Sequence, residues 1–374
     1  MFNGQPQLTI KALKNKKFNN SCLINEKTFN TGSIADCLEH CLEDCRCQSF
    51  QICGETKCQL CSSHKELKNS SLLHDNDTCI YAMYEMRHAQ KFDNHCSTIS
   101  CPKKYNCCQQ QSDLCPSNKI CKPFNSPKKP WKRFTCECRD GYRGNNCDKP
   151  IRSCGGYRSQ KSGMYKVRSS VNDLLYEVYC HFDSDGAWTL VQSFSFANHT
   201  IENSVFRKPL SEDHPVSQNA VTWSGYRLSR TRMQFINQNS DLLRFTCAFE
   251  DGHDVDQTDY LQMSLEQLGD EKDITANNPN IVMSAYRGKI KETDLYLEGC
   301  KIKLHQKDDE VLHVHIDKNG NSCERFGDQK PDNSECVKFE YFSYFSDKDC
   351  LLPTHRCTQN EKSTSQLWFG KKPS

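Results

Sequence analysis

One stretch of the sequence decides how this chain is organised: Cys136-Glu137-Cys138-Arg139-Asp140-Gly141-Tyr142-Arg143-Gly144-Asn145-Asn146-Cys147. It places three cysteines, two glycines and an aromatic residue at six fixed positions within twelve residues. Glycine adopts the positive backbone angles that tight turns need, so Gly141 and Gly144 predict turns between the cysteines. The stretch indicates a small cross-linked module, and it divides the chain into a part before it and a part after it.

Composition limits the class of protein. A chain of 374 residues has room for two or three domains. Its 26 cysteines exceed what cytosolic chains of this size carry and indicate an oxidising, secretory compartment. Apolar residues make up only 36% of the chain, so cross-links worth about 2–4 kcal/mol each are needed to stabilise the smaller modules. The net charge of +2 argues against nucleic acid as a partner.

The sequence shows neither a membrane span nor a visible signal peptide. No run approaches the ~20 apolar residues that cross a bilayer. Residues 1–7 lack a basic start and an apolar core, so we expect the true beginning of the secreted protein to be missing from this sequence. Sequons for N-linked glycosylation fit a secreted glycoprotein, although each is equally consistent with chance: Asn19, Asn69, Asn76 and Asn198.

The N-terminal part begins with a segment rich in lysine and asparagine, residues 1–20, which we expect to be a flexible lead-in. The segment 22–79 then holds nine cysteines. Within it, the pattern from Ser33 onward is typical of a short helix with Ser33 as its N-cap. Cys37 and Cys41 are four residues apart and face the same side of that helix, so we expect them to attach it to neighbouring strands.

Residues 21–90 resemble a PAN/apple module, a small α+β fold. The resemblance is carried by the outer pair Cys22 and Cys79, the helix cysteines Cys37 and Cys41, Cys47 before Ser-Phe, and Cys58 before Gln-Leu. It implies a disulfide between the two outer cysteines.

Residues 94–149 hold nine further cysteines and resemble an EGF-like module, a small β structure. The stretch quoted above carries this resemblance, which implies a disulfide between Cys138 and Cys147. The first three cysteines of the module remain open: they are either Cys107 or Cys108 with Cys115 and Cys121, or Cys96, Cys101 and Cys107. Because both N-terminal segments hold an odd number of cysteines, we expect one disulfide between them.

The composition changes in residues 151–374, where cysteines become sparse. Strands with alternating, aromatic-rich patterns are predicted at 164–167, 175–179 and 188–191, with a turn at 183–186 and a helix at 264–268. A further strand pair, 310–316 and 323–326, flanks a polar turn. We expect an α+β domain that is large enough to bury a core of its own.

This domain resembles a divergent fibrinogen C-terminal domain. The residues that carry the resemblance are Cys154, Ser162-Gly163-Met164-Tyr165, Val178-Tyr179-Cys180 and Gly186-Ala187-Trp188-Thr189-Leu190-Val191-Gln192. It implies a disulfide between Cys154 and Cys180, and a small loop closed by Cys323 and Cys336.

The same resemblance points to a calcium loop shortly before Cys323, where the family carries an Asp-x-Asp motif. This sequence keeps Asp317 and has Asn319 in place of the second aspartate. Calcium takes six to eight oxygen ligands, of which these two side chains and nearby carbonyls would supply several. A polar hairpin turn is the competing interpretation, and no other cofactor is indicated.

One basic segment is a candidate binding site. Lys128, Lys129, Lys132 and Arg133 surround Trp131 between two cysteines, and we expect them on an exposed loop. Clustered cations with an aromatic residue suit a sulfated polysaccharide or another polyanion. The alternative is an ordinary solvated loop.

The complete architecture is similar to uncharacterised skeletal organic matrix proteins of stony corals. This resemblance implies a secreted, non-enzymatic protein of the extracellular matrix that contacts proteins or glycans through its modules, with the organic matrix of a mineralised skeleton as its expected location. A soluble fibrinogen-like lectin that acts in recognition or adhesion is the alternative. No catalytic motif, such as Gly-x-Ser-x-Gly or His-Glu-x-x-His, occurs in the sequence.

Overall fold

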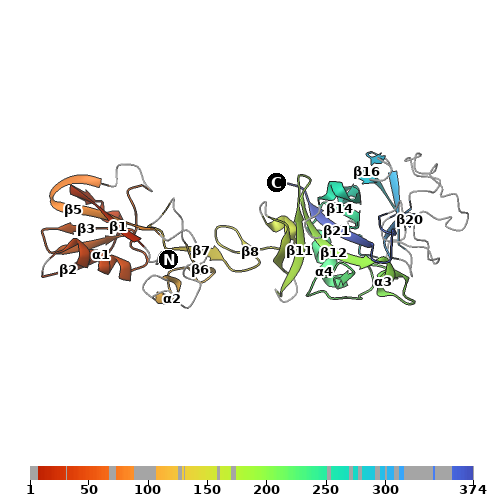
Figure 1. Ribbon diagram of the computed structural model, residues 1–374, viewed down its shortest axis with the longest axis horizontal. Helices are drawn as coiled ribbons and strands as arrows, with labels where there is room; N and C mark the ends of the chain where they lie inside the picture. Colours follow the sequence, from red (N-terminus) through yellow and green to blue (C-terminus); the bar gives the residue numbers. More distant parts are fainter. Residues whose placement is uncertain are drawn as a thin grey trace, which may run out of the picture. The chain divides into compact units, whose positions relative to one another are not determined.

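The computed structural model describes residues 7–30, 32–66, 73–87, 107–124, 129, 131–157, 161–169, 174–250, 254–268, 273–276, 280–290, 295–299, 301–306, 311–315, 340–341 and 356–373. The chain divides into two compact units, an N-terminal unit Met1–Arg139 and a C-terminal unit Asp140–Ser374 (Figure 1). The described part is disulfide-rich and β-rich, with few helices.

The N-terminal unit is built on an antiparallel sheet of five strands in the order β1-β5-β3-β4-β2. The strands are β1 (Gln7–Phe18), β2 (Leu23–Thr28), β3 (Ser49–Cys53), β4 (Lys57–Cys61) and β5 (Leu73–Arg87). The flexible lead-in expected over residues 1–20 is therefore wrong for its described part, because β1 pairs with β5 from Gln7 to Phe18. The lysines of β1 lie on an edge strand, where charge discourages pairing with another chain.

Helix α1 (Ile34–Glu43) confirms the prediction made from its N-cap. The Ser33 hydroxyl accepts a hydrogen bond from the main-chain N–H of Asp36 at 3.0 Å. Cys37 and Cys41 both face the core, and disulfides join them to Cys58 and Cys47. The helix is thus attached to the sheet, as the four-residue spacing predicted.

The disulfide expected between Cys22 and Cys79 is not formed, which corrects the pairing implied by the resemblance. Cys22 pairs with Cys61, and Cys79 pairs with Cys53. The sheet register explains this result. Cys53 and Cys79 are direct partners on β3 and β5, with Cα atoms 4.2 Å apart, while Cys22 precedes β2 at the end of β4 that carries Cys61.

The rest of the N-terminal unit is a short cross-linked hairpin. It contains α2 (Cys107–Gln110), β6 (Lys119–Pro123) and β7 (Phe134–Cys138), and β6 pairs with β7. Disulfides Cys108–Cys121 and Cys115–Cys136 hold it. Cys107 instead pairs with Cys45, which confirms the expected disulfide between the two N-terminal segments. Cys96 and Cys101 lie outside the described residues.

The C-terminal unit begins with the short pair β8 (Tyr142–Arg143) and β9 (Lys149–Pro150) and contains a sheet of twelve strands. Its main order is β10-β11-β12-β21-β14-β15-β16-β18-β19-β20, with β13 on β12 and β17 on β16. The strands are β10 (Gly163–Arg168), β11 (Leu175–Phe182), β12 (Ala187–Ser195), β13 (Gly225–Arg227), β14 (Leu242–Cys247), β15 (Asp259–Ser264), β16 (Asn280–Ile290), β17 (Leu295–Leu297), β18 (Lys301–His305), β19 (His313–His315), β20 (Glu340–Tyr341) and β21 (Thr364–Lys371).

The three strands predicted at 164–167, 175–179 and 188–191 are confirmed as β10, β11 and β12. The predicted helix at 264–268 is a 3₁₀ turn, η7 (Leu265–Leu268). Of the predicted pair around the polar turn, β19 lies within 310–316 and pairs with β18 and β20, while 323–326 lies outside the described residues.

The last strand, β21, lies between β12 and β14 in the middle of the sheet, as Figure 1 shows. The Trp188 ring packs so closely over Gly370 of β21 that a side chain at Gly370 would collide with it. The described part of this unit also contains helices α3 (Phe196–Thr200) and α4 (Arg230–Gln238) and the 3₁₀ turns η4 (Cys154–Gly156), η5 (Val205–Arg207) and η6 (Val255–Gln257).

Candidate functional site

The basic segment of the N-terminal unit is only partly an exposed loop. Lys129 is exposed, and the ammonium nitrogen of Lys132 lies 5.0 Å from the centre of the Phe124 ring. Trp131 is buried, and its indole stacks on the His64 ring with centres 3.8 Å apart. Lys128 lies outside the described residues. The tryptophan therefore anchors the segment instead of presenting itself to a ligand.

Arg133 is buried, and its assignment to polyanion binding is wrong. Its guanidinium donates hydrogen bonds to the carbonyl oxygens of Leu42 at 2.9 Å, Asp44 at 2.8 Å and Cys41 at 3.3 Å. The last carbonyls of a helix have no partner within the helix and attract positive charge. Arg133 gives these carbonyls of α1 both a hydrogen-bond donor and a positive charge. Its donors are therefore not available to an external polyanion.

The cysteines that the sequence analysis selected are disulfide-bonded wherever they lie within the described residues. Cys154 pairs with Cys180, the pair that the fibrinogen-like resemblance implies. Cys138 and Cys147 are each disulfide-bonded. No sequence pattern indicated the disulfide Cys247–Cys357, which joins residues 110 positions apart. Cys323 and Cys336 lie outside the described residues.

The expected calcium residues Asp317 and Asn319 also lie outside the described residues. Within the part of the chain that is described, histidine, cysteine and acidic side chains form no group of three or more that could hold a metal ion.

The sequons occupy different surroundings. Asn19 is exposed, and its side-chain oxygen accepts the N–H of Ser21 at 3.1 Å. Asn76 lies on β5, where its side-chain oxygen accepts the N–H of Thr78 at 3.0 Å. Asn198 lies on α3 and lines a pocket of the C-terminal unit. Asn69 lies outside the described residues.

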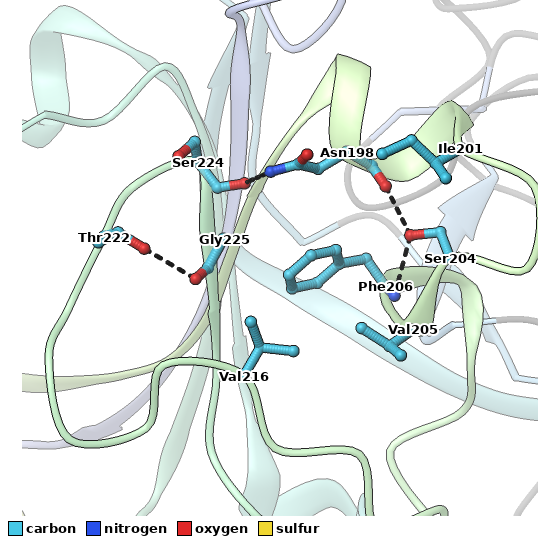
Figure 2. Close-up of a pocket in the computed structure, with 9 residues that line it drawn as sticks. All are labelled: Asn198, Ile201, Ser204, Val205, Phe206, Val216, Thr222, Ser224 and Gly225. Atoms are coloured by element: carbon cyan, nitrogen blue, oxygen red, sulfur yellow. Dashed lines mark hydrogen bonds between the residues drawn. The ribbon is translucent and has the colours of Figure 1, made fainter.

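The pocket beside Asn198 has a volume of about 430 Å³ and is shown in Figure 2. This volume is within the range of ~300–1,000 Å³ that is typical of small-molecule sites. Its lining residues are Asn198, Ile201, Ser204, Val205, Phe206, Val216, Thr222, Ser224 and Gly225. They come from α3 and the residue after it, from η5 and the residue before it, and from the loop that leads into β13 together with the first residue of that strand. No side chain in this lining carries a charge.

A buried arginine holds one wall of this pocket in place. The Arg227 guanidinium on β13 donates to the carbonyl oxygens of Val205 at 3.0 Å, Lys208 at 2.8 Å, Pro209 at 2.6 Å and Glu212 at 3.0 Å. Burial lowers the pKa of Arg227 to about 10, so it stays charged at neutral pH. The pocket wall formed by η5 is thus fixed by main-chain contacts.

Among the described acids of the C-terminal unit, Asp183 has the most strongly lowered pKa, and its carboxylate is bound within the fold. Asp183 Oδ1 accepts hydrogen bonds from the main-chain N–H groups of Asp185 at 2.9 Å and Gly186 at 3.0 Å, and from the indole N–H of Trp188 at 3.0 Å. Its Oδ2 accepts from the buried Arg244 guanidinium at 2.6 Å. These contacts confirm the predicted turn at 183–186 and connect it to β14.

Electrostatics make this contact sensitive to acid. Burial alone would raise the pKa of the Asp183 carboxyl, but hydrogen bonding to His181 and the charge of Arg244 outweigh it. The pKa in the folded protein therefore lies well below the ordinary value of about 3.9. The ionised carboxylate contributes stability above the unfolded-state pKa, and this contribution is lost as the pH falls toward the folded-state pKa.

Replacing Asp183 with Asn is expected to destabilise the C-terminal unit by about 3–5 kcal/mol at neutral pH, because Arg244 is left buried without its counter-charge. Denaturant unfolding followed by tryptophan fluorescence measures this, since Trp188, Trp223 and Trp368 belong to this unit. Between pH 5 and pH 2 the variant is expected to lose less stability than the wild type. Asp185→Asn is the control from the same turn, because its ion-pair partner Arg287 is half-exposed and the asparagine oxygen can still accept the hydrogen bond from Gln262. Equal losses in both variants would contradict the assignment.

Replacing Arg133 with Ala is expected to destabilise α1 by about 2–3 kcal/mol, because three carbonyls lose a charged donor. Hydrogen exchange of peptides from Ile34–Glu43, measured against urea concentration, reports this local stability. The exposed Lys129→Ala is the control and is expected to stay within about 0.5 kcal/mol of wild type. Unchanged protection in Arg133→Ala would show that these carbonyl contacts contribute little.

Comparison with known proteins found no family model and no curated protein that matches this chain. Within the described residues, no helix combines the length and the apolar character that a bilayer crossing requires.

Proposed function

We propose that this chain is a secreted, non-enzymatic protein of the extracellular matrix that acts through rigid, cross-linked modules. The observation that carries the proposal is the cysteine pairing. Every cysteine in the described residues is disulfide-bonded. Disulfides in such density form and persist in oxidising compartments outside the cytosol.

The modules are a PAN/apple-like module in residues 21–90, an EGF-like module in 94–149 and a divergent fibrinogen C-terminal-like domain in 151–374. A helix attached to an antiparallel sheet by Cys37–Cys58 and Cys41–Cys47 supports the first. The interlaced disulfides Cys108–Cys121 and Cys115–Cys136 support the second. For the third, support comes from Cys154–Cys180.

A cross-linked connection between the first two modules suits a matrix role. Cys45–Cys107 joins them covalently, and Arg133 and Trp131 of the hairpin pack against the first module. The two modules thus present their surfaces in one fixed arrangement. Several weak contacts held in a fixed arrangement gain strength through effective concentration.

The partner class is a polyanionic glycan or another matrix component. Lys129 and Lys132 remain available on the basic segment, next to Lys128 in the sequence. The similarity to coral skeletal proteins favours the organic matrix of a mineralised skeleton as the location. Strongly perturbed groups such as Asp183 and Arg244 bind each other within the fold, which favours a structural role over catalysis.

Mass spectrometry of proteins released by demineralising cleaned skeleton from the source animal, compared with its soft tissue, tests the location. Peptides of this chain are expected to be enriched in the fraction occluded within the mineral. If the peptides occur only in soft tissue or mucus, the skeletal location is wrong and a soluble recognition protein becomes the better explanation.

Heparin chromatography of the secreted full chain tests the partner class. The variant Lys128→Ala, Lys129→Ala, Lys132→Ala is expected to elute at lower salt than the wild type, because it loses three cations of one segment. The matched control removes three lysines that each pair with an acid elsewhere in the N-terminal unit: Lys16, Lys57 and Lys122. Equal shifts in both variants would mean that net charge alone sets retention and that the segment is an ordinary solvated loop.

A further inference from the structure

The pocket of the C-terminal unit contains its own attachment point for a ligand. Asn198 starts the sequon Asn198-His199-Thr200, and its side chain forms part of the pocket lining. In Figure 2 the Asn198 amide extends across the pocket beside Phe206, and its nitrogen donates to the carbonyl oxygen of Ser224 at 2.6 Å. The acceptor nitrogen of the sequon thus lies at the pocket itself.

The local fold turns this side chain outward. The neighbouring His199 is fully buried, and its ring stacks on Phe194 with centres 5.4 Å apart. Since successive helical side chains point in different directions, an inward His199 places Asn198 toward the surface. The main chain around Asn198 is also fixed, because its carbonyl oxygen accepts the Ser204 hydroxyl at 2.5 Å.

The chemistry of the lining suits the apolar face of a sugar. Ile201, Val205, Phe206 and Val216 supply hydrocarbon, and Ile201 is 58% exposed despite its size. The hydroxyl protons of Ser204 and Thr222 are already donated to main-chain carbonyls, the second to Gly225 at 2.8 Å. A free polar ligand would find few donors here to fix its orientation, whereas a covalently attached ligand does not depend on them.

We propose that Asn198 carries an N-linked oligosaccharide and that its first residue, N-acetylglucosamine, occupies this pocket against Ile201 and Phe206. The pocket is then a seat for the chain's own glycan. The inference rests on the proposed secretion, because attachment requires passage through the secretory pathway.

The Asn198 side-chain nitrogen forms a bond to the anomeric carbon of a polyprenyl diphosphate oligosaccharide and loses one proton. The bond between that carbon and the diphosphate oxygen breaks, and the diphosphate leaves with the electron pair. The amide nitrogen keeps its second hydrogen, which serves as a donor toward a carbonyl such as that of Ser224.

The other described sequons provide internal controls, because neither contributes to this pocket. Asn19 is exposed, and Asn76 lies on a strand of the N-terminal unit. A glycan at either site has no seat in the pocket and is expected to be open to enzymes.

The test uses the full chain, secreted from glycosylating cells with a heterologous leader. The native protein is treated with peptide-N-glycosidase in ¹⁸O water, and peptides that contain Asn19, Asn76 and Asn198 are followed over time by mass spectrometry. Occupancy at Asn198 is expected, with release there at least tenfold slower than at Asn19. After denaturation the two rates are expected to be equal.

Two variants distinguish two explanations of slow release at Asn198: a sugar bound in the pocket, and a helix that the enzyme cannot reach. Gly225→Leu fills the pocket, since a Cβ at this position lies 3.4 Å from the Asn198 amide nitrogen and 3.7 Å from the Phe206 ring. Ile201→Ser removes exposed hydrocarbon from the wall and does not disturb the core. In both, release at Asn198 is expected to approach the rate at Asn19. If Gly225→Leu fails to fold, Ile201→Ser alone decides the question.

The outcomes separate this inference from the proposed function. Occupied Asn19 or Asn76 with unoccupied Asn198 would overturn the glycan seat and leave secretion supported. Rapid release from native Asn198, or slow release that Ile201→Ser leaves unchanged, would also overturn it. Retention of the chain inside the cell without any glycan would overturn both.

Discussion

Cystine cross-links are the constraint on which the N-terminal unit depends. Its apolar side chains form two small clusters, in which cysteines themselves are prominent members. Burial of so little hydrocarbon offsets only part of the conformational entropy of a chain this long. The disulfides reduce the entropy of the unfolded chain instead, and they join helix α1 to the sheet, strand β3 to strand β5, and the sheet segment to the hairpin that follows it.

The C-terminal unit is stabilised differently. It has one large apolar cluster, and its sheet is completed by β21, which is inserted between β12 and β14. The middle of the sheet therefore depends on a strand that lies far from both of its neighbours in the sequence. Cys247–Cys357 covalently secures the segment that leads into this strand, so the long-range arrangement does not depend on packing alone.

Two buried arginines have similar roles in the two units. Arg133 binds carbonyls at the end of α1, and Arg227 binds four carbonyls of the segment that forms the pocket wall. Each side chain uses several donors to fix an irregular segment that lacks regular main-chain partners. In the basic segment the Arg133 guanidinium is bound within the fold, whereas Lys129 is exposed. In the C-terminal unit it gives the Asn198 pocket a fixed wall.

Local features of this fold were readable from the sequence. The Ser33 cap, the common face of Cys37 and Cys41 and the three strands that begin the C-terminal domain depend on neighbours a few residues away. The expected link between the two N-terminal segments followed from the odd cysteine counts, although counting could not identify Cys45 and Cys107 as its ends.

Tertiary structure decided the remaining features, because they depend on sheet order and register. Cys22 pairs with Cys61 and not with Cys79 because the start of β2 lies beside the end of β4 that carries Cys61. Arg133 and Lys129 are equivalent cations in the sequence, but only Arg133 reaches the carbonyls of a helix about ninety residues earlier. The sequon at Asn198 is visible in three letters, whereas the pocket around it exists only once η5 and the loop before β13 are folded against α3. Short-range propensity determines where helices, strands and caps form, because it depends on neighbouring residues. Long-range contacts determine which residues each side chain packs against or binds.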